Sequence, residues 1–199
     1  MSARTFTGIP FTPKAKCRNC KHLEQCRNRD NSYTAKNILI DCEEFYYIFK
    51  KLEEFERLPT FDGNVEKHAE EMLAYEEKHE GVPFLTSPLI VNGALAAELA
   101  LKSLIFMENA EFECIHNLQR LFEQLPDRHK IPLSKMIYRQ THQNEETLNI
   151  NLHRISNLFE VFRYSFEKEA VGYTNFFNAF VHIVCDYAIS QKVSDEINN

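Results

Sequence analysis

Four cysteines near the amino terminus have a spacing that suits a metal ion. Cys17, Cys20, Cys26 and Cys42 follow the pattern C-x2-C-x5-C-x15-C. Two thiolates two residues apart can meet one cation from a tight turn, and two further sulfurs complete the tetrahedron of structural zinc. The spacing therefore predicts a zinc knuckle, with an iron–sulfur cluster on the same thiolates as the alternative. His22 could replace one sulfur, and Cys42 could instead be a small side chain on an apolar helix face.

Basic side chains gather around these cysteines. They are Lys14, Lys16, Arg18, Lys21, Arg27 and Arg29. Around a metal-folded knuckle they would form a phosphate-binding surface, but they could equally offset the charge of the thiolates. The whole chain has a formal net charge of −6, so contact with RNA would depend on such a local patch.

Composition limits the kind of protein that can position these groups. The chain has 199 residues, of which 44% are hydrophobic and 26% charged, enough for one ordinary domain with a core. Only 5 glycines are present, which argues against a glycine-loop nucleotide site and a turn-rich sandwich. No run of eighteen apolar residues and no apolar leader is found, so we expect no membrane span and a cytoplasmic protein with reduced thiols.

Helical patterns follow one another after residue 60. The expected helices lie near Asn64–Glu80, Leu89–Met107, Ile115–Leu125, Pro132–Thr141, Leu148–Phe166 and Thr174–Ser190. We expect Gly81-Val82-Pro83 to end the first and Ser87 to cap the second. The fifth has an apolar seam with steps of three and four residues. The sequence thus predicts an all-α, up-and-down bundle over residues 61–199, behind a cysteine-rich metal-binding segment at residues 1–60.

Three stretches resemble the HEPN domain family. They are Asn92-Gly-Ala-Leu-Ala-Ala-Glu-Leu-Ala-Leu-Lys-Ser-Leu-Ile, His116-Asn-Leu-Gln-Arg-Leu-Phe and Ile155-Ser-Asn-Leu-Phe-Glu-Val-Phe-Arg-Tyr-Ser-Phe-Glu167. The family has an alanine-rich helix with a Glu and a Lys, and a His-x-Leu at the start of the next helix. The resemblance covers about residues 88–190. It implies a helical bundle that cleaves RNA, binds nucleotides, or serves in toxin systems or antiphage defence.

The resemblance also implies where a ribonuclease site would lie. HEPN ribonucleases use an Arg, four to six residues and then a His, which face the same motif across a dimer. Arg would stabilise the phosphorane charge while His moves the 2′-hydroxyl proton. In this chain Arg163 has no such histidine after it, and Arg139 precedes His142 by only three residues. The usual motif is therefore missing, and a ribonuclease would need Arg139 with His142, or Arg163 with a histidine from elsewhere.

Several other charged residues allow both a functional and a structural interpretation. Glu160, Arg163 and Glu167 share a helix side that could line a phosphate-binding cleft or simply face solvent. Glu98 and Lys102 lie four residues apart in an apolar helix, where a buried structural pair is favoured over a ligand site. His116 is expected to cap or pack locally rather than to catalyse.

His182 and Asp186 on the last predicted helix are also four residues apart. They could bind a metal or donate a proton, but we expect both to face water.

These observations predict a divergent, non-catalytic HEPN-like protein that binds RNA, a nucleotide or a protein partner. Homodimerisation and a role in bacterial defence or a toxin system are part of this prediction. An RNA-cleaving endoribonuclease with a rearranged site and a purely structural dimerising adaptor are the alternatives.

Overall fold

The computed structural model describes residues 35–59, 62–81, 85–109, 115–163 and 174–197. Within these ranges the chain is helical and contains no strand, which confirms the all-α class. The helices are α2 (Ala35–Glu56), α3 (Val65–Lys78), α4 (Thr86–Asn109), α5 (Leu118–Glu123), α6 (Asp127–Thr141), α7 (Glu145–Ile155), α8 (Leu158–Arg163) and α9 (Thr174–Ile197). Cys17, Cys20 and Cys26 lie outside the described residues.

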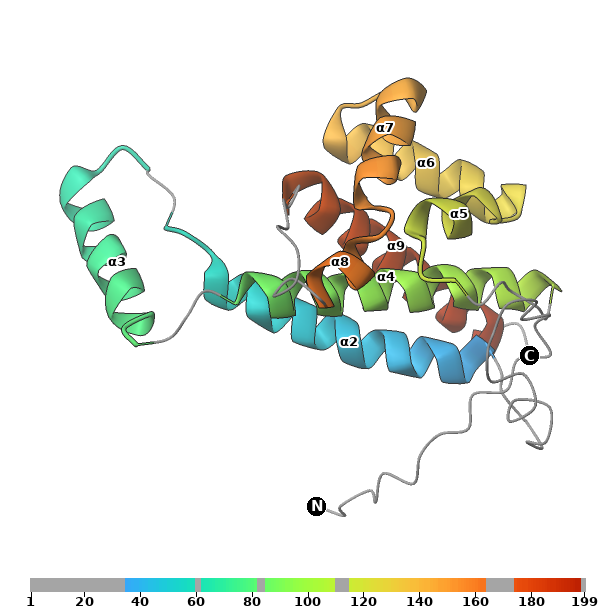
Figure 1. The fold of residues 1–199 in the computed structure, drawn as a ribbon, viewed down its shortest axis with the longest axis horizontal. Helices are drawn as coiled ribbons and strands as arrows, with labels where there is room; N and C mark the ends of the chain where they lie inside the picture. Colours follow the sequence, from blue (N-terminus) through green and yellow to red (C-terminus); the bar gives the residue numbers. More distant parts are fainter. Residues whose placement is uncertain (1–34, 60–61, 82–84, 110–114, 164–173, 198–199) are drawn as a thin grey trace, which may run out of the picture.

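Helix α4 is the centre of the bundle, as its nearly uniform apolar character predicts. It packs against α2, α5, α8 and α9, and Figure 1 shows it between α2 on one side and α5, α7 and α8 on the other. Small residues let these neighbours approach: Ala94, Ala96, Ala97 and Ala100 are all completely buried. At Gly93, an added Cβ would lie 2.7 Å from the Phe49 ring of α2, so only glycine permits this contact.

Helix α2 belongs to the bundle and not to a separate cysteine-rich segment. Its residues Ile38, Leu39, Tyr46 and Phe49 are buried in the same core as α4 and α9. The bundle therefore includes residues from Ala35 onward, whereas the predicted bundle begins at residue 61. Core side chains at helical spacing decide which part of the chain joins the core.

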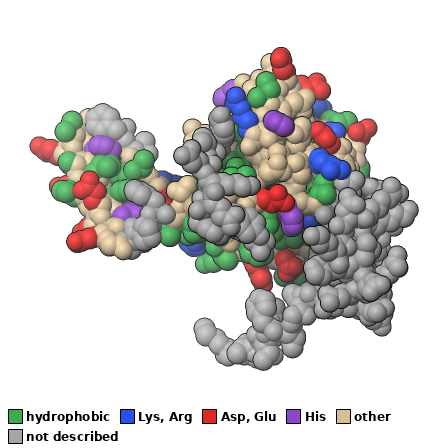
Figure 2. All heavy atoms as spheres, in the orientation of Figure 1, with side chains coloured by type: hydrophobic (Ala, Val, Ile, Leu, Met, Phe, Trp, Pro, Cys, Tyr) green, Lys and Arg blue, Asp and Glu red, His purple; other side chains and the backbone are tan. Residues whose placement is uncertain are grey.

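Helix α3 stands beside the bundle and contributes nothing to its core. It has no buried residue, and Figure 1 shows it set apart at the far left. Its contacts with α2 are at its C-terminal end, where Lys78 Nζ donates to the Phe55 carbonyl and the His79 ring lies 4.5 Å from the Phe55 ring. Figure 2 shows carboxylates spread over this arm.

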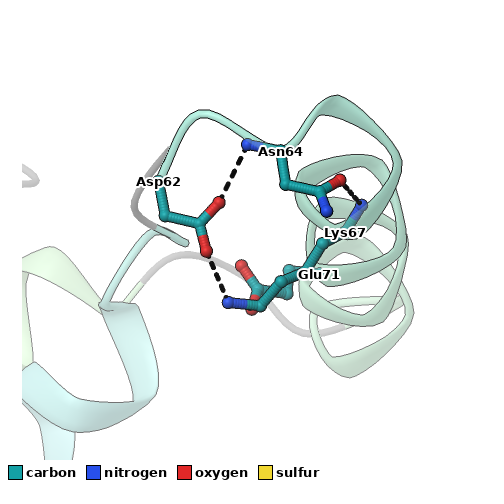
Figure 3. Close-up of polar contacts among 4 residues, drawn as sticks. All are labelled: Asp62, Asn64, Lys67 and Glu71. Carbon is teal, nitrogen blue, oxygen red and sulfur yellow. Dashed lines mark hydrogen bonds and ion pairs between the residues drawn. The ribbon is translucent and has the colours of Figure 1, made fainter.

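Local hydrogen bonds start helix α3. Asn64 accepts a hydrogen bond from the Lys67 backbone nitrogen at 3.0 Å, which is the N-cap arrangement. Asp62 in turn accepts from the Asn64 backbone nitrogen at 3.0 Å and pairs with Lys67 Nζ at 2.6 Å (Figure 3). Lys67 also reaches Glu71 at 3.7 Å. The helix ends at Lys78 with His79 as its C-cap, so Gly81, with φ of +69°, lies two residues beyond the cap and does not end the helix as predicted. Val82 and Pro83 lie outside the described residues.

The apolar seam of the fifth predicted helix is buried, but that helix is broken. Leu148, Leu152, Ile155 and Phe162 are buried as expected, yet α7 ends at Ile155 and α8 starts at Leu158. The carbonyl of Ser156 accepts from the Leu118 backbone nitrogen at 2.9 Å instead of continuing the helix. Phe166 lies outside the described residues.

Two predicted helix starts are also wrong. Helix α4 begins at Thr86, so Ser87 is inside its first turn rather than at the cap. Helix α6 begins at Asp127 and continues through Pro132, which removes one backbone hydrogen bond without ending the helix.

By length and composition alone, α4 could cross a membrane, although no run of eighteen apolar residues exists. Most of α4 is buried inside the bundle, which is also what the core helix of a soluble protein shows. The expected absence of a membrane span stays a prediction.

Candidate functional site

Glu98 and Lys102 form a buried ion pair on the central helix. Lys102 Nζ lies 2.6 Å from Glu98 Oε1, and both side chains are at least 95% buried. Their spacing of four residues places them one turn apart on α4. Because an unpaired charge in this core would cost several kcal/mol, the pairing explains how both are tolerated. The predicted structural pair is confirmed.

His116 joins this pair from the chain just before α5. Its Nδ1 lies 2.9 Å from Glu98 Oε2 and 3.1 Å from Oε1, so the carboxylate contacts Lys102 and His116 together. The imidazole also stacks on Phe159 of α8, with ring centroids 5.1 Å apart. The histidine is thus held by α4 on one side and by α8 on the other. The expectation that His116 only caps or packs locally is wrong, because its partner is 18 residues away.

This geometry leaves one imidazole nitrogen available for chemistry. The carboxylate next to Lys102 is an acceptor, so His116 Nδ1 donates to it and Nε2 points elsewhere. The His116 side chain is 47% exposed, whereas that of Glu98 is 3% exposed. A carboxylate that fixes the tautomer of a half-exposed histidine is the arrangement that general bases and phosphate-binding histidines use. We call Glu98, Lys102, His116 and Phe159 the His116 cluster.

The remaining predicted site residues do not join the His116 cluster. Arg139 and His142 are exposed at the end of α6, where His142 ends the helix with φ of 54°. Glu160 is exposed on α8. Arg163 is the last residue of α8, four positions after Phe159, and nothing is described of its side chain. Glu167 lies outside the described residues.

Cys42 lies in the core of the bundle. Its Sγ donates to the Ala96 carbonyl at 3.3 Å and lies 4.0 Å from the Cys185 Sγ. Both thiols are completely buried, and burial raises the pKa of the Cys185 thiol, which keeps it protonated and unreactive. The alternative interpretation of Cys42, as a small side chain on an apolar helix face, describes its position, and Cys185 packs in the same core.

Among the described residues, no three metal-binding side chains are close enough to hold an ion. With Cys42 in the core, the zinc or iron–sulfur prediction depends on the cysteines outside the described residues.

A second polar network, which the sequence analysis missed, connects α2 with α9. The Tyr46 hydroxyl lies 2.7 Å from His182 Nδ1 and donates to Asp186 at 2.9 Å. His182 Nε2 lies 2.7 Å from Glu53 Oε2, and Asn178 donates to the other oxygen of Glu53 at 3.1 Å. The prediction that His182 and Asp186 face water is wrong for His182, which is partly buried and bonded through both nitrogens. Asp186 is exposed as predicted, but it also accepts a hydrogen bond from Tyr46. We call Tyr46, Glu53, His182 and Asp186 the His182 network.

Hydrogen bonds occupy both nitrogens of His182. The Tyr46 hydroxyl donates to Asp186 and contacts His182 Nδ1, and His182 Nε2 contacts a carboxylate oxygen of Glu53. Burial and the neighbouring Asp186 raise the pKa of the Tyr46 hydroxyl, which keeps its proton in place. Both nitrogens of this histidine are thus used inside the protein.

Comparison with known proteins found no matching family model, no matching curated protein and no matching solved structure. The resemblance to HEPN proteins stays a prediction that rests on the residues quoted above.

Proposed function

We propose that this protein binds RNA or a nucleotide through a phosphate group at the His116 cluster. The observation that carries the proposal is the half-exposed His116, whose Nδ1 is bonded to Glu98 and whose ring stacks on Phe159. A protonated imidazole donates from Nε2 to a phosphate oxygen, as histidines in phosphate sites do. The HEPN resemblance, with its roles in defence and toxin systems, makes RNA the first ligand to test.

Charge balance around His116 supports an anionic ligand. Lys102 neutralises Glu98 within the core, so protonation of His116 makes the cluster positive overall. Arg163 is the last residue of α8 and follows Phe159 by one helical turn, so we propose it as a second cation for the ligand. Phe159 stacks on the imidazole and so helps to hold His116 in place for the ligand.

Binding is measured by fluorescence anisotropy with a labelled single-stranded RNA of mixed sequence and by competition with ATP. We expect His116→Gln to weaken binding at least tenfold and His153→Gln to leave it unchanged. His153 is the matched control because it is an exposed histidine on nearby α7, bonded to Gln119 rather than to the cluster. Equal affinities of the two variants, or no affinity of the wild type for RNA and ATP, would refute the proposal.

A specific observation also favours the alternative of an endoribonuclease. A carboxylate that holds a histidine through Nδ1 leaves Nε2 to remove the proton of a 2′-hydroxyl, which is the role of a general base. In this alternative, His116 takes the place of the missing histidine as the proposed partner of Arg163. Loss of RNA cleavage in His116→Gln and Arg163→Ala, with retention in Arg139→Ala and His142→Ala, would establish this activity. Intact RNA after incubation with the wild type would exclude it.

We further propose that zinc binds at the amino-terminal cysteines, with an iron–sulfur cluster as the alternative. Cys17, Cys20 and Cys26 provide three thiolates, and His22 provides a fourth ligand in place of the buried Cys42. Metal analysis of protein purified without chelators should give one zinc per chain. Cys20→Ala should lose the zinc and Cys42→Ala should keep it. A brown protein containing iron would instead support the cluster.

A further inference from the structure

An exposed stripe on α2 combines apolar side chains with opposite charges. The apolar members are Ile40, Tyr47 and Ile48, which are 37%, 60% and 42% exposed. Glu44 and Lys51 lie on the same side of the helix, in steps of three and four residues from the apolar ones. We call these five residues the α2 stripe. It faces away from α4, and Figure 1 shows no described helix covering that side of α2.

The order of charges along the α2 stripe is self-complementary. Consider two antiparallel copies of α2 related by a twofold axis that passes between Tyr47 and Ile48. Tyr47 of each copy then lies beside Ile48 of the other copy. The same axis places Glu44 of each copy opposite Lys51 of the other, so two attractive charge pairs flank an apolar centre. An isologous dimer needs a surface that complements itself in this way, and tyrosine is enriched at such interfaces.

We propose that the α2 stripe binds a second copy of this chain as an antiparallel helix pair. The helix has 22 residues, or about 33 Å of length, which allows the centre and both charge pairs to form together. In the single chain, Lys51 pairs only with the exposed Glu54, one turn away, at 2.8 Å. Because both side chains of this pair are exposed, Lys51 can leave Glu54 and pair with Glu44 of the second copy. The dimer is independent of the His116 cluster, so either proposal can fail alone.

Charge reversal tests the pairing by sedimentation equilibrium of the full chain. One helix pair buries less than the roughly 1,600 Å² of a standard interface, so the measurement uses high protein concentration, on the order of 100 µM. We expect a dimer for the wild type. Glu44→Lys and Lys51→Glu should each be monomeric, because each places like charges opposite one another twice. The double variant restores both pairs and should be dimeric.

A mixture of the two single variants gives the sharpest outcome. Glu44→Lys supplies two lysines and Lys51→Glu supplies two glutamates, so their equimolar mixture should form a heterodimer although neither associates alone. Tyr47→Glu should abolish the dimer, and Glu70→Lys on α3 is the control for a change of charge elsewhere. A monomeric wild type at this concentration, or a dimer that both single variants retain, would overturn the proposal.

Discussion

Two histidines in this bundle each contact a glutamate, but they differ in what remains available for a ligand. His182 uses both nitrogens, with Tyr46 on one side and Glu53 on the other. His116 gives Nδ1 to Glu98, while Nε2 has no described partner and the side chain is half exposed. A histidine with both nitrogens occupied holds helices together, whereas one that is oriented from one side can act on a ligand. The comparison supports a structural role for His182 and is the basis of the proposed ligand-binding role of His116.

The largest effect is expected from breaking the buried pair beneath His116. Lys102→Met leaves the buried Glu98 with His116 as its remaining described partner and should lower the free energy of unfolding by about 3 kcal/mol. Urea denaturation followed by circular dichroism measures it. The double variant Glu98→Leu with Lys102→Met removes both charges and should recover most of the loss. Wild-type stability of the single variant would show that the pair is not buried as described.

The next largest loss of stability is expected from removing the Tyr46 hydroxyl at the centre of the His182 network. Tyr46→Phe removes the hydrogen bonds to His182 and Asp186 and should cost about 1–3 kcal/mol of unfolding free energy. Tyr47→Phe is the matched control, because Tyr47 is its exposed neighbour on the same helix and has no described hydrogen bond. An equal loss of stability in both variants would contradict a structural role for the network.

High pH should lower the stability of the folded protein through the Tyr46 hydroxyl, by less than the substitutions above. The folded protein holds the Tyr46 proton above the ordinary tyrosine pKa of about 10, but the unfolded chain releases it there. The unfolded state then binds fewer protons than the folded state, so stability falls as pH rises above about 10. Burial raises the pKa of Cys185 and acts in the same direction. Urea midpoints between pH 9 and 11 should therefore fall less steeply in Tyr46→Phe than in the wild type.

Sequence periodicity predicted which face of each helix is buried, but not which helices contact each other through those faces. The apolar run of α4 and the seam at Leu148 and Leu152 lie in the core because a repeat of three and four residues specifies a buried stripe. The pair Glu98–Lys102 was predictable for the same reason, since both residues are on one helix. The contact of His116 with Glu98 depends on the path of the chain between α4 and α5, which no local pattern encodes.

The network between α2 and α9 was beyond sequence reasoning for a related reason. Tyr46 and His182 are 136 positions apart, and each alone resembles an ordinary helix residue. Only the packing of α2 against α9 brings them together. A useful signal was present: Tyr46, Phe49 and Glu53 follow helical spacing in a segment assigned to the metal site, which indicates a core helix whose polar residue needs a partner.

Glutamine substitutions at the two histidines should change stability least of all the variants, and they should affect stability and RNA affinity in opposite ways. His116→Gln keeps a donor for Glu98 at a half-exposed position, so its unfolding free energy should change by less than about 1 kcal/mol while RNA affinity falls. His182→Gln can satisfy only one of its two partners and should lose about 1–2 kcal/mol while RNA affinity stays unchanged. Denaturation and anisotropy on the same two proteins measure both quantities. A purely structural residue changes ligand binding only by unfolding the protein. If His182→Gln is fully folded and still loses RNA affinity, His182 is not purely structural and the proposed difference between the two histidines is wrong.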